Sequence, residues 1–234
     1  MPNDPTRTSG SYTYTVTSGF ADKPVVYVSF YDALRFANWL HNGQPVGAQD
    51  STTTEDGAYT ITAAGITANS ITRNAGATIF LTSEDEWYKA AYYDAVTATY
   101  FDYPTGTDTQ TGCVLPASDT GNSANCWPAT SPTGALTDAG AYTLSDSPAG
   151  TFDQAGNVWE WNEAILFGSN RGQRGGSWGF TFPGDLAPWG RYVAAPASEF
   201  SSLGFRVASL PEPGTGLLVA AGLLGVAGWR RRRG

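Results

Sequence analysis

The chain has 234 residues, of which 41% are hydrophobic and 15% charged, and its formal net charge is −8. This length fits one domain of ordinary size followed by a short tail. Because an acidic chain repels phosphate backbones, the charge argues against nucleic-acid binding and favours divalent cations as partners.

The first predicted helix follows a predicted strand over residues 12–16, where Tyr and Thr alternate. Ser29 is suited to cap this helix, with Asp32 three residues later, and Gly43 is suited to end it. The apolar residues between the two ends recur at helical spacing, at Phe30, Ala33, Leu34, Ala37 and Leu40.

A second helix is predicted in the middle of the chain. Thr82 or Ser83 caps it, its first turn is acidic as the helix dipole favours, and it continues to residue 93 or 94. Residues 95–152 predict mainly loops. Short strands are expected over residues 58–62, 79–81, 158–161, 175–178 and 204–208.

The last 25 residues differ in character from those before them. Residues 214–229 contain no charge, but a helix of this length spans only ~24 Å, short of the ~30 Å hydrocarbon core of a membrane. The motif Pro211-Glu212-Pro213 prevents a helix from entering this stretch from the domain. Arg230 and Arg231 begin a run of four arginines, which holds this end on the cytoplasmic side of the membrane.

These three parts, in this order, resemble the PEP-CTERM sorting tail of Gram-negative bacteria. The resemblance implies an exported protein that is held in the inner membrane transiently, processed by an exosortase, and moved to the cell surface or extracellular matrix. A simple tail-anchored protein is the alternative, and it also places the domain outside the cytoplasm. Residues 1–10 lack the features of a secretory signal peptide, so we expect the natural start to lie upstream of Met1.

The two cysteines of the chain, Cys113 and Cys126, lie within the predicted loop region. Nearby cysteines in an exported protein usually pair, so we expect a disulfide that stabilises these loops by roughly 3 kcal/mol. Two free thiols are the alternative.

Four segments of the body resemble the formylglycine-generating-enzyme family, also called the sulfatase-modifying-factor domain. They are VSFYDALRFANWL (28–40), LTSEDEWYKAAYYD (81–94), AGNVWEW (155–161) and the pair RGGSW (174–178) and LGFRVA (203–208). The resemblance implies an α+β, C-type-lectin-like fold with few regular elements and long loops, followed by a short hydrophobic C-terminal helix. It divides the chain into a domain over residues 1–209 and a tail over residues 210–234.

The family's oxidation of a sulfatase cysteine relies on two copper-binding cysteines between GGSW and GFR. Residues 179–203 contain no cysteine. Without a thiolate this site has neither a nucleophile nor a soft copper ligand, so we expect neither the activity nor copper. The single histidine, His41, nearly excludes a Ser/His/Asp triad or a histidine-rich metal centre.

Three further residue groups in the motifs are interpreted first as structural. Trp159 and Trp161 are two apart, so on a strand they share one face and fill the core. Gly175 and Gly176 permit positive φ or close backbone approach, and Arg206 is expected to pair with a buried acid.

Calcium is the predicted structural cofactor. The resemblance implies a first site formed by Asp153, Gly156, Val158 and Glu160, where a buried salt bridge of Glu160, with Arg206 as the candidate partner, is the alternative. It also implies a second and weaker site formed by Asn125, Cys126, Asp138 and Tyr142. Both sets are rich in the oxygen ligands that calcium takes.

The segment after Gly176 forms the ligand-facing surface in related lectin-like domains. Here its exposed candidates are Trp178, Phe180, Trp189, Arg191 and Tyr192, and core packing is the alternative for the aromatic residues. We therefore expect a non-catalytic, lectin-like module that binds a glycan, a matrix polymer or a protein. An enzyme of unrecognised chemistry and a structural matrix component are the alternatives.

Overall fold

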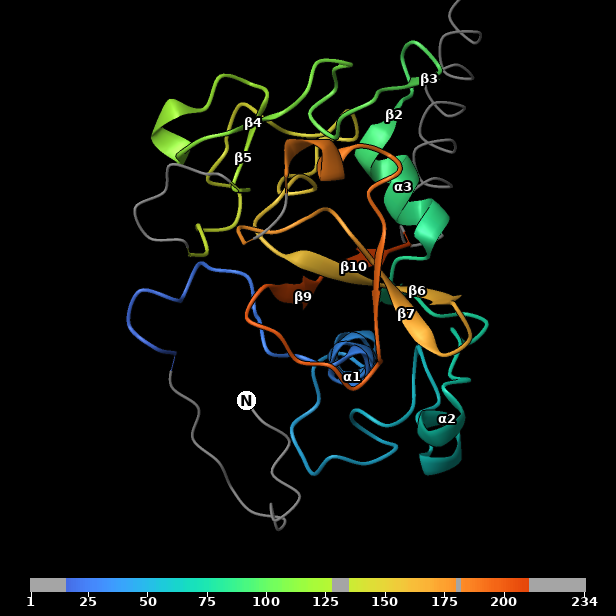
Figure 1. Cartoon of the computed structure of the whole chain (residues 1–234). Coiled ribbons are helices and arrows are strands. Elements are labelled where there is room, and N and C mark those ends of the chain that lie inside the picture. Colours follow the sequence, from blue (N-terminus) through green and yellow to red (C-terminus); the bar gives the residue numbers. More distant parts are fainter. Residues whose placement is uncertain (1–15, 128–134, 180–181, 211–234) are drawn as a thin grey trace, which may run out of the picture.

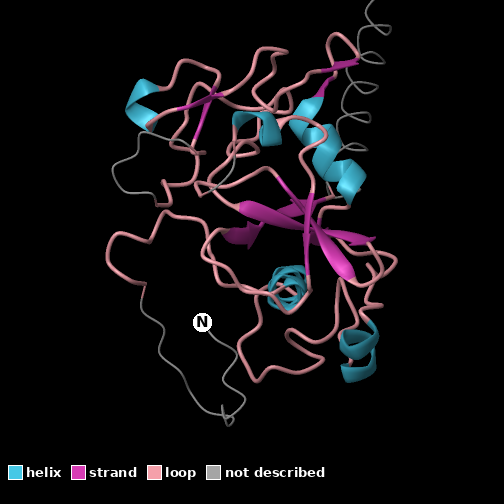
Figure 2. Ribbon diagram, in the orientation of Figure 1, coloured by secondary structure: helices cyan, strands magenta, loops and turns pink. Residues whose placement is uncertain are grey.

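The computed structural model describes residues 16–127, 135–179 and 182–210. The helices are α1 (Phe30–His41), α2 (Ala63–Ala68) and α3 (Glu84–Tyr92), with 3-10 turns η1 (Pro116–Ser118) and η2 (Pro183–Leu186). The strands are β1 (Ile79–Leu81), β2 (Tyr93–Asp94), β3 (Thr99–Tyr100), β4 (Gly112–Cys113), β5 (Ser123–Ala124), β6 (Trp159–Leu166), β7 (Asn170–Arg174), β8 (Tyr192–Ala194), β9 (Leu203–Phe205) and β10 (Val207–Ser209). The fold is thus α+β with few regular elements, as expected (Figure 2).

A four-stranded sheet in the order β8-β7-β6-β9 forms the centre of the molecule (Figure 1). Strand β6 pairs antiparallel with β7 and parallel with β9, and β7 pairs antiparallel with β8. A second, two-stranded sheet pairs β1 with β10. Helix α1 and helix α3 lie on opposite sides of the central sheet (Figure 1). Among the described residues, no helix is long and apolar enough to cross a membrane.

Helix α1 has the predicted ends. Ser29 and Asp32 form a reciprocal capping box, and Gly43 follows the C-cap with a φ of 80°. The predicted apolar stripe faces the main core, where Phe30 makes an edge contact with Trp161 at 6.1 Å. Trp159 packs against the same core, which confirms that the two tryptophans contribute to packing.

The predicted strand over residues 58–62 is wrong, because the structure has only an isolated bridge between Tyr59 and Arg73. The side chain of Asn38 explains this. Its amide donates to the Tyr59 carbonyl at 2.9 Å and accepts from the Tyr59 N–H at 2.8 Å. A buried side chain thereby replaces a neighbouring strand as the partner of this backbone.

Strand β1 matches its prediction, and Ser83 caps α3 through a capping box with Glu86. Helix α3 ends at Tyr92, earlier than predicted, because residues 93–94 pair with β3 as strand β2.

Two predicted strands near the C-terminal motif require correction. Residues 175–178 are not a strand, because Gly175 and Gly176 have φ values of 95° and 79° and end β7 at Arg174. Residues 204–208 are divided at Arg206 between β9 and β10, which belong to different sheets. The strand predicted over residues 12–16, the C-terminal helix and the sorting residues Pro211, Glu212, Pro213, Arg230 and Arg231 fall almost entirely outside the described residues.

The loops between β3 and β6 surround a smaller core of their own. Cys113 and Cys126 form a disulfide in the structure, with Cα atoms 5.0 Å apart. Cys126 is fully buried and packs with Leu186 and Ala187. The loop region is therefore connected to the segment that leads into β8.

Candidate binding site

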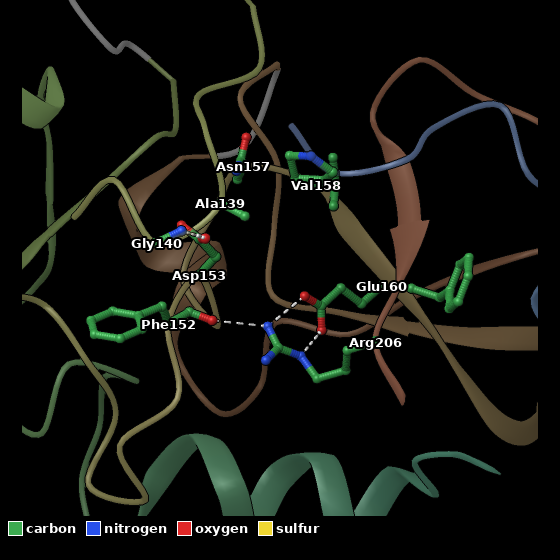
Figure 3. Close-up of a pocket in the computed structure, with 10 residues that line it drawn as sticks. Ala139, Gly140, Phe152, Asp153, Asn157, Val158, Glu160 and Arg206 are labelled. Carbon is green, nitrogen blue, oxygen red and sulfur yellow. Dashed lines mark hydrogen bonds and ion pairs between the residues drawn. The ribbon is translucent and has the colours of Figure 1, made fainter. Parts of the chain in front are cut away.

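A buried ion pair between β6 and the β9–β10 junction defines the centre of the site (Figure 3). Arg206 donates to both carboxylate oxygens of Glu160, at 2.5 Å from Nε and 2.6 Å from Nη2. The indole of Trp87 donates to the same carboxylate at 2.7 Å. The prediction that Arg206 pairs with a buried acid is confirmed, because the Glu160 side chain is only 5% exposed.

A pocket of about 420 Å³ lies beside this ion pair (Figure 3). Its walls are apolar in large part and come from segments that are distant in the sequence. They consist of Pro24, Ala139, Gly140, Phe152, Val158 and Phe205, and the polar lining is Asp153, Asn157, Glu160 and Arg206. Apolar walls with a few polar groups are typical of ligand pockets.

Asp153 is the unusual group of this pocket. It has a φ of 56°, and its Oδ2 accepts a hydrogen bond from the Gly140 N–H at 2.6 Å. Its Oδ1 is buried and has no hydrogen-bond partner among the described residues. Burial raises the pKa of the Asp153 carboxyl, the Gly140 N–H partly offsets this, and the nearby charge of Glu160 adds to it.

The first predicted calcium site is brought together in part. Asp153, Val158 and Glu160 all line the pocket, whereas Gly156 is not among its lining residues. The free oxygen of Asp153 fits a cation, because a buried carboxylate oxygen requires a charge or a donor. Glu160 fits less well, since the Arg206 guanidinium already neutralises it.

The second predicted calcium site is dispersed among other partners. Asn125 donates to the Ala135 carbonyl at 3.0 Å, Asp138 pairs with Lys23 at 2.8 Å, and the Tyr142 hydroxyl donates to the Val114 carbonyl at 2.7 Å. Cys126 contributes its sulfur to the disulfide, whereas the predicted calcium ligand is its carbonyl oxygen. In the described part of the chain, no group of three or more His, Cys, Asp or Glu side chains is placed to hold a metal ion.

The predicted ligand surface is only partly exposed. Trp178 is half-buried, with its indole donating to the Ser201 carbonyl at 3.4 Å, and Phe180 lies outside the described residues. Trp189 is 70% exposed and Tyr192 is 52% exposed. The ring of Tyr192 packs on Trp159 at 4.6 Å.

Arg191 extends in a different direction from Tyr192, toward the start of helix α3. Its Nε lies 3.1 Å from Oε1 of Glu84. Glu84 also accepts from Arg174 and, at 2.7 Å, from Asn162. The predicted surface is therefore divided between two sides of the β8 strand.

The 187–191 loop, which carries Trp189 and Arg191, is held firmly in place. Arg174 donates to the carbonyls of Pro188 and Gly190 at 2.6 and 3.0 Å. Gly190 must be glycine, because a Cβ there would lie 1.7 Å from the Asp185 carbonyl oxygen. Sequence reasoning did not assign a role to Arg174, although its place at the head of the RGGSW motif was a usable signal.

This arrangement defines a class: an α+β domain with a central four-stranded sheet, long loops, and a pocket beside the ion pair that the WEW and GFR motifs form. The chain belongs to the family described as "Sulfatase-modifying factor enzyme 1-like domain", whose model matches residues 3–210. No curated protein sequence matches the chain.

Three solved structures share the fold. CarF and Treponema denticola variable protein 1 are each 22% identical to the chain, with TM-scores of 0.56. The alignments cover 83% and 89% of this chain and 71% and 78% of those chains, respectively. PvdO from Pseudomonas aeruginosa is 21% identical with a TM-score of 0.51, over 81% of this chain and 63% of PvdO. The formylglycine-generating-enzyme fold expected from the sequence is thus confirmed.

The C-terminal tail also matches a known signal. Residues 209–233 match the model of the PEP-CTERM protein-sorting motif. The protein is therefore exported and processed at the membrane in a Gram-negative bacterium, and the motif implies processing by an exosortase.

Proposed function

We propose that this chain is a non-catalytic binding module, displayed at the cell surface or in the extracellular matrix, that holds a glycan, a matrix polymer or a protein. The observation that carries the proposal is Trp189, a 70% exposed tryptophan on a loop that Arg174 holds by two carbonyls. Large exposed rings on a rigid support are typical of binding surfaces, because little side-chain freedom is lost on binding.

The absence of catalysis is supported by the sequence at the family's reactive position. Residues 179–203 contain no cysteine, so the thiolate chemistry of formylglycine generation has no group to perform it. Both cysteines of the chain are consumed in the disulfide in the structure.

A binding screen of the full chain tests the proposal, with a glycan array and pull-downs of matrix polymer and surface protein. We expect a ligand whose binding is lost in Trp189→Ala and weakened in Tyr192→Ala. Phe167→Ala is the matched control, because Phe167 is an 85% exposed aromatic residue at a different place, in the β6–β7 turn. Equal binding by all variants would show that Trp189 and Tyr192 do not form the binding surface.

The final location is tested by cell fractionation. We expect the body on the cell surface or in the matrix, without its last residues, and the full-length chain in the inner membrane of a strain that lacks the exosortase. Recovery of the intact chain from the cytoplasm would contradict the proposal.

Calcium binding at Asp153 is a further part of the proposal. Its support is the buried oxygen of Asp153 that has no hydrogen-bond partner among the described residues, in a pocket that Val158 also lines. Oxygen ligands of this kind suit calcium. We expect calcium to raise the melting temperature of the wild-type chain and not that of Asp153→Ala. Calorimetry without any calcium-dependent heat would exclude the site.

One observation favours the enzyme alternative, because a carboxyl with a raised pKa in a pocket is a feature of catalytic acids. Against it, Glu160 is already bound by Arg206 and Trp87, so Asp153 has no free acidic partner in the pocket. Turnover of a bound glycan that is lost in Asp153→Asn would establish the enzyme.

A further inference from the structure

A cluster of four tyrosines lies on helix α3 and the adjoining β2–β3 hairpin. The ring centroids of Tyr88 and Tyr92 are 4.9 Å apart, those of Tyr88 and Tyr100 are 5.5 Å apart, and those of Tyr93 and Tyr100 are 4.9 Å apart. Tyr92 is buried and supports the others, whereas Tyr100 is about half exposed. Neighbouring rings are tilted by 46° to 57°, so together they form a twisted platform.

This tyrosine cluster is continuous with the 187–191 loop through two contacts. The guanidinium carbon of Arg174, which holds the carbonyls of Pro188 and Gly190, lies 5.6 Å from the ring centroid of Tyr88. The hydroxyl of Tyr92 donates to the carbonyl of Leu186 at 2.9 Å. The backbone of the loop and the tyrosine cluster are therefore linked through Arg174 and Tyr92.

Four charged side chains near this surface have partners. Arg191 and Arg174 share the carboxylate of Glu84, and the Lys89 ammonium lies 5.2 Å from the ring centroid of Tyr93. The excess of acidic residues in the whole chain also opposes the approach of polyanions. Because cations lie over the rings of Tyr88 and Tyr93, the most accessible aromatic surface is that of Tyr100 and Trp189.

We propose that this surface, from Tyr93 and Tyr100 across Tyr88 to Trp189, binds several consecutive sugars of a linear polysaccharide. The inference rests on the proposed binding function and names its ligand class. The apolar faces of pyranose rings stack on aromatic side chains, and a row of linked sites raises affinity with chain length. Because the contacts are mainly apolar, binding is expected to resist salt.

Affinity electrophoresis of the full chain in native gels tests the proposal, with hydroxyethylcellulose as the neutral polymer and alginate as the acidic one. We expect at least one polymer to retard the wild type, equally at low salt and at 0.5 M NaCl, where the screening length is about 4 Å. Tyr100→Ala should weaken retardation about three- to tenfold, the range expected for one aromatic contact. Tyr100→Phe should bind as the wild type, since it keeps the ring, and Phe167→Ala serves as the off-site control.

Competition with fragments of the retarding polymer provides the second measurement. We expect a fragment of about six sugars to compete at least tenfold better than a disaccharide, because linked sites act together.

Loss of binding in Trp189→Ala with no effect of Tyr100→Ala, or equal competition by both fragments, would overturn this inference and leave the proposed function standing. Retardation by alginate alone that disappears at high salt would overturn the stacking mechanism. A wild type that no polymer retards, but that captures a surface protein, would replace the polysaccharide with a protein ligand.

Discussion

The carboxylate of Glu160 and the guanidinium of Arg206 meet in two hydrogen bonds of 2.5 and 2.6 Å, although 46 positions separate them in the chain. The pair connects β6 to the junction of β9 and β10, and Trp87 of helix α3 donates to it from the other side. Two strands, one helix and one wall of the pocket therefore depend on a single ion pair.

Removal of one partner of this pair should destabilise the domain strongly. Arg206→Met leaves the Glu160 charge buried, so we expect the free energy of unfolding to fall by about 3–5 kcal/mol. Urea denaturation measures the change. The double variant Glu160→Gln/Arg206→Met should recover part of the loss, because it removes the unpaired charge. Additive losses in the double variant would show that the two residues do not interact.

The stability of the domain should depend on pH through Asp153. Its pKa is higher in the folded than in the unfolded chain, mainly because the group is buried, so the folded state holds the proton more tightly. This contribution to stability is complete below the ordinary pKa of about 3.9 and is lost as the pH rises through the raised value.

Asp153→Asn stays uncharged, so it should lack this loss. In calcium-free buffer its melting temperature should rise relative to the wild type as the pH increases from 4 to 7. Asp146→Asn, at an exposed aspartate, is the control and should follow the wild type. If the melting temperatures of Asp153→Asn and the wild type changed with pH in parallel, burial would not raise the pKa of Asp153 as stated.

The disulfide should stabilise the loops between β3 and β6. Reduction, or Cys113→Ser with Cys126→Ser, should lower the free energy of unfolding by roughly 3 kcal/mol, because the unfolded chain gains freedom. Peptide mapping without reductant should recover the two cysteines in one crosslinked fragment. Free thiols in protein purified from the periplasm or the medium would show that the bond does not form there.

Asn38 should be indispensable to the α1 side of the core. Asn38→Leu keeps the side-chain size but leaves the buried N–H and carbonyl of Tyr59 unpaired, so we expect a loss of about 3 kcal/mol. Asn42→Ala, one turn further along, removes bonds to the Thr53 and Asp56 carbonyls at a more exposed site and should cost less. An equal loss in both variants would place the effect in the helix and not in the buried contact.

The local signals in the sequence were reliable where the structure describes them. The capping boxes at Ser29 and Ser83 are formed, because each depends only on residues three positions apart. The sequence patterns that predict strands were less reliable. Residues 58–62 do not form the predicted strand, because the side chain of Asn38, distant in the sequence, takes the backbone hydrogen bonds of Tyr59.

The sequence by itself determined the family, the N-terminal ends of α1 and α3, the paired tryptophans of the WEW motif and the sorting tail, because each of these is written in one or a few short contiguous patterns. Only the tertiary structure decided which acid Arg206 binds, that Arg174 joins the 187–191 loop to the tyrosine cluster, and that Asp153 keeps an oxygen without a partner. The physical reason is distance along the chain. These contacts join segments many positions apart, and their geometry exists only after the sheet has formed.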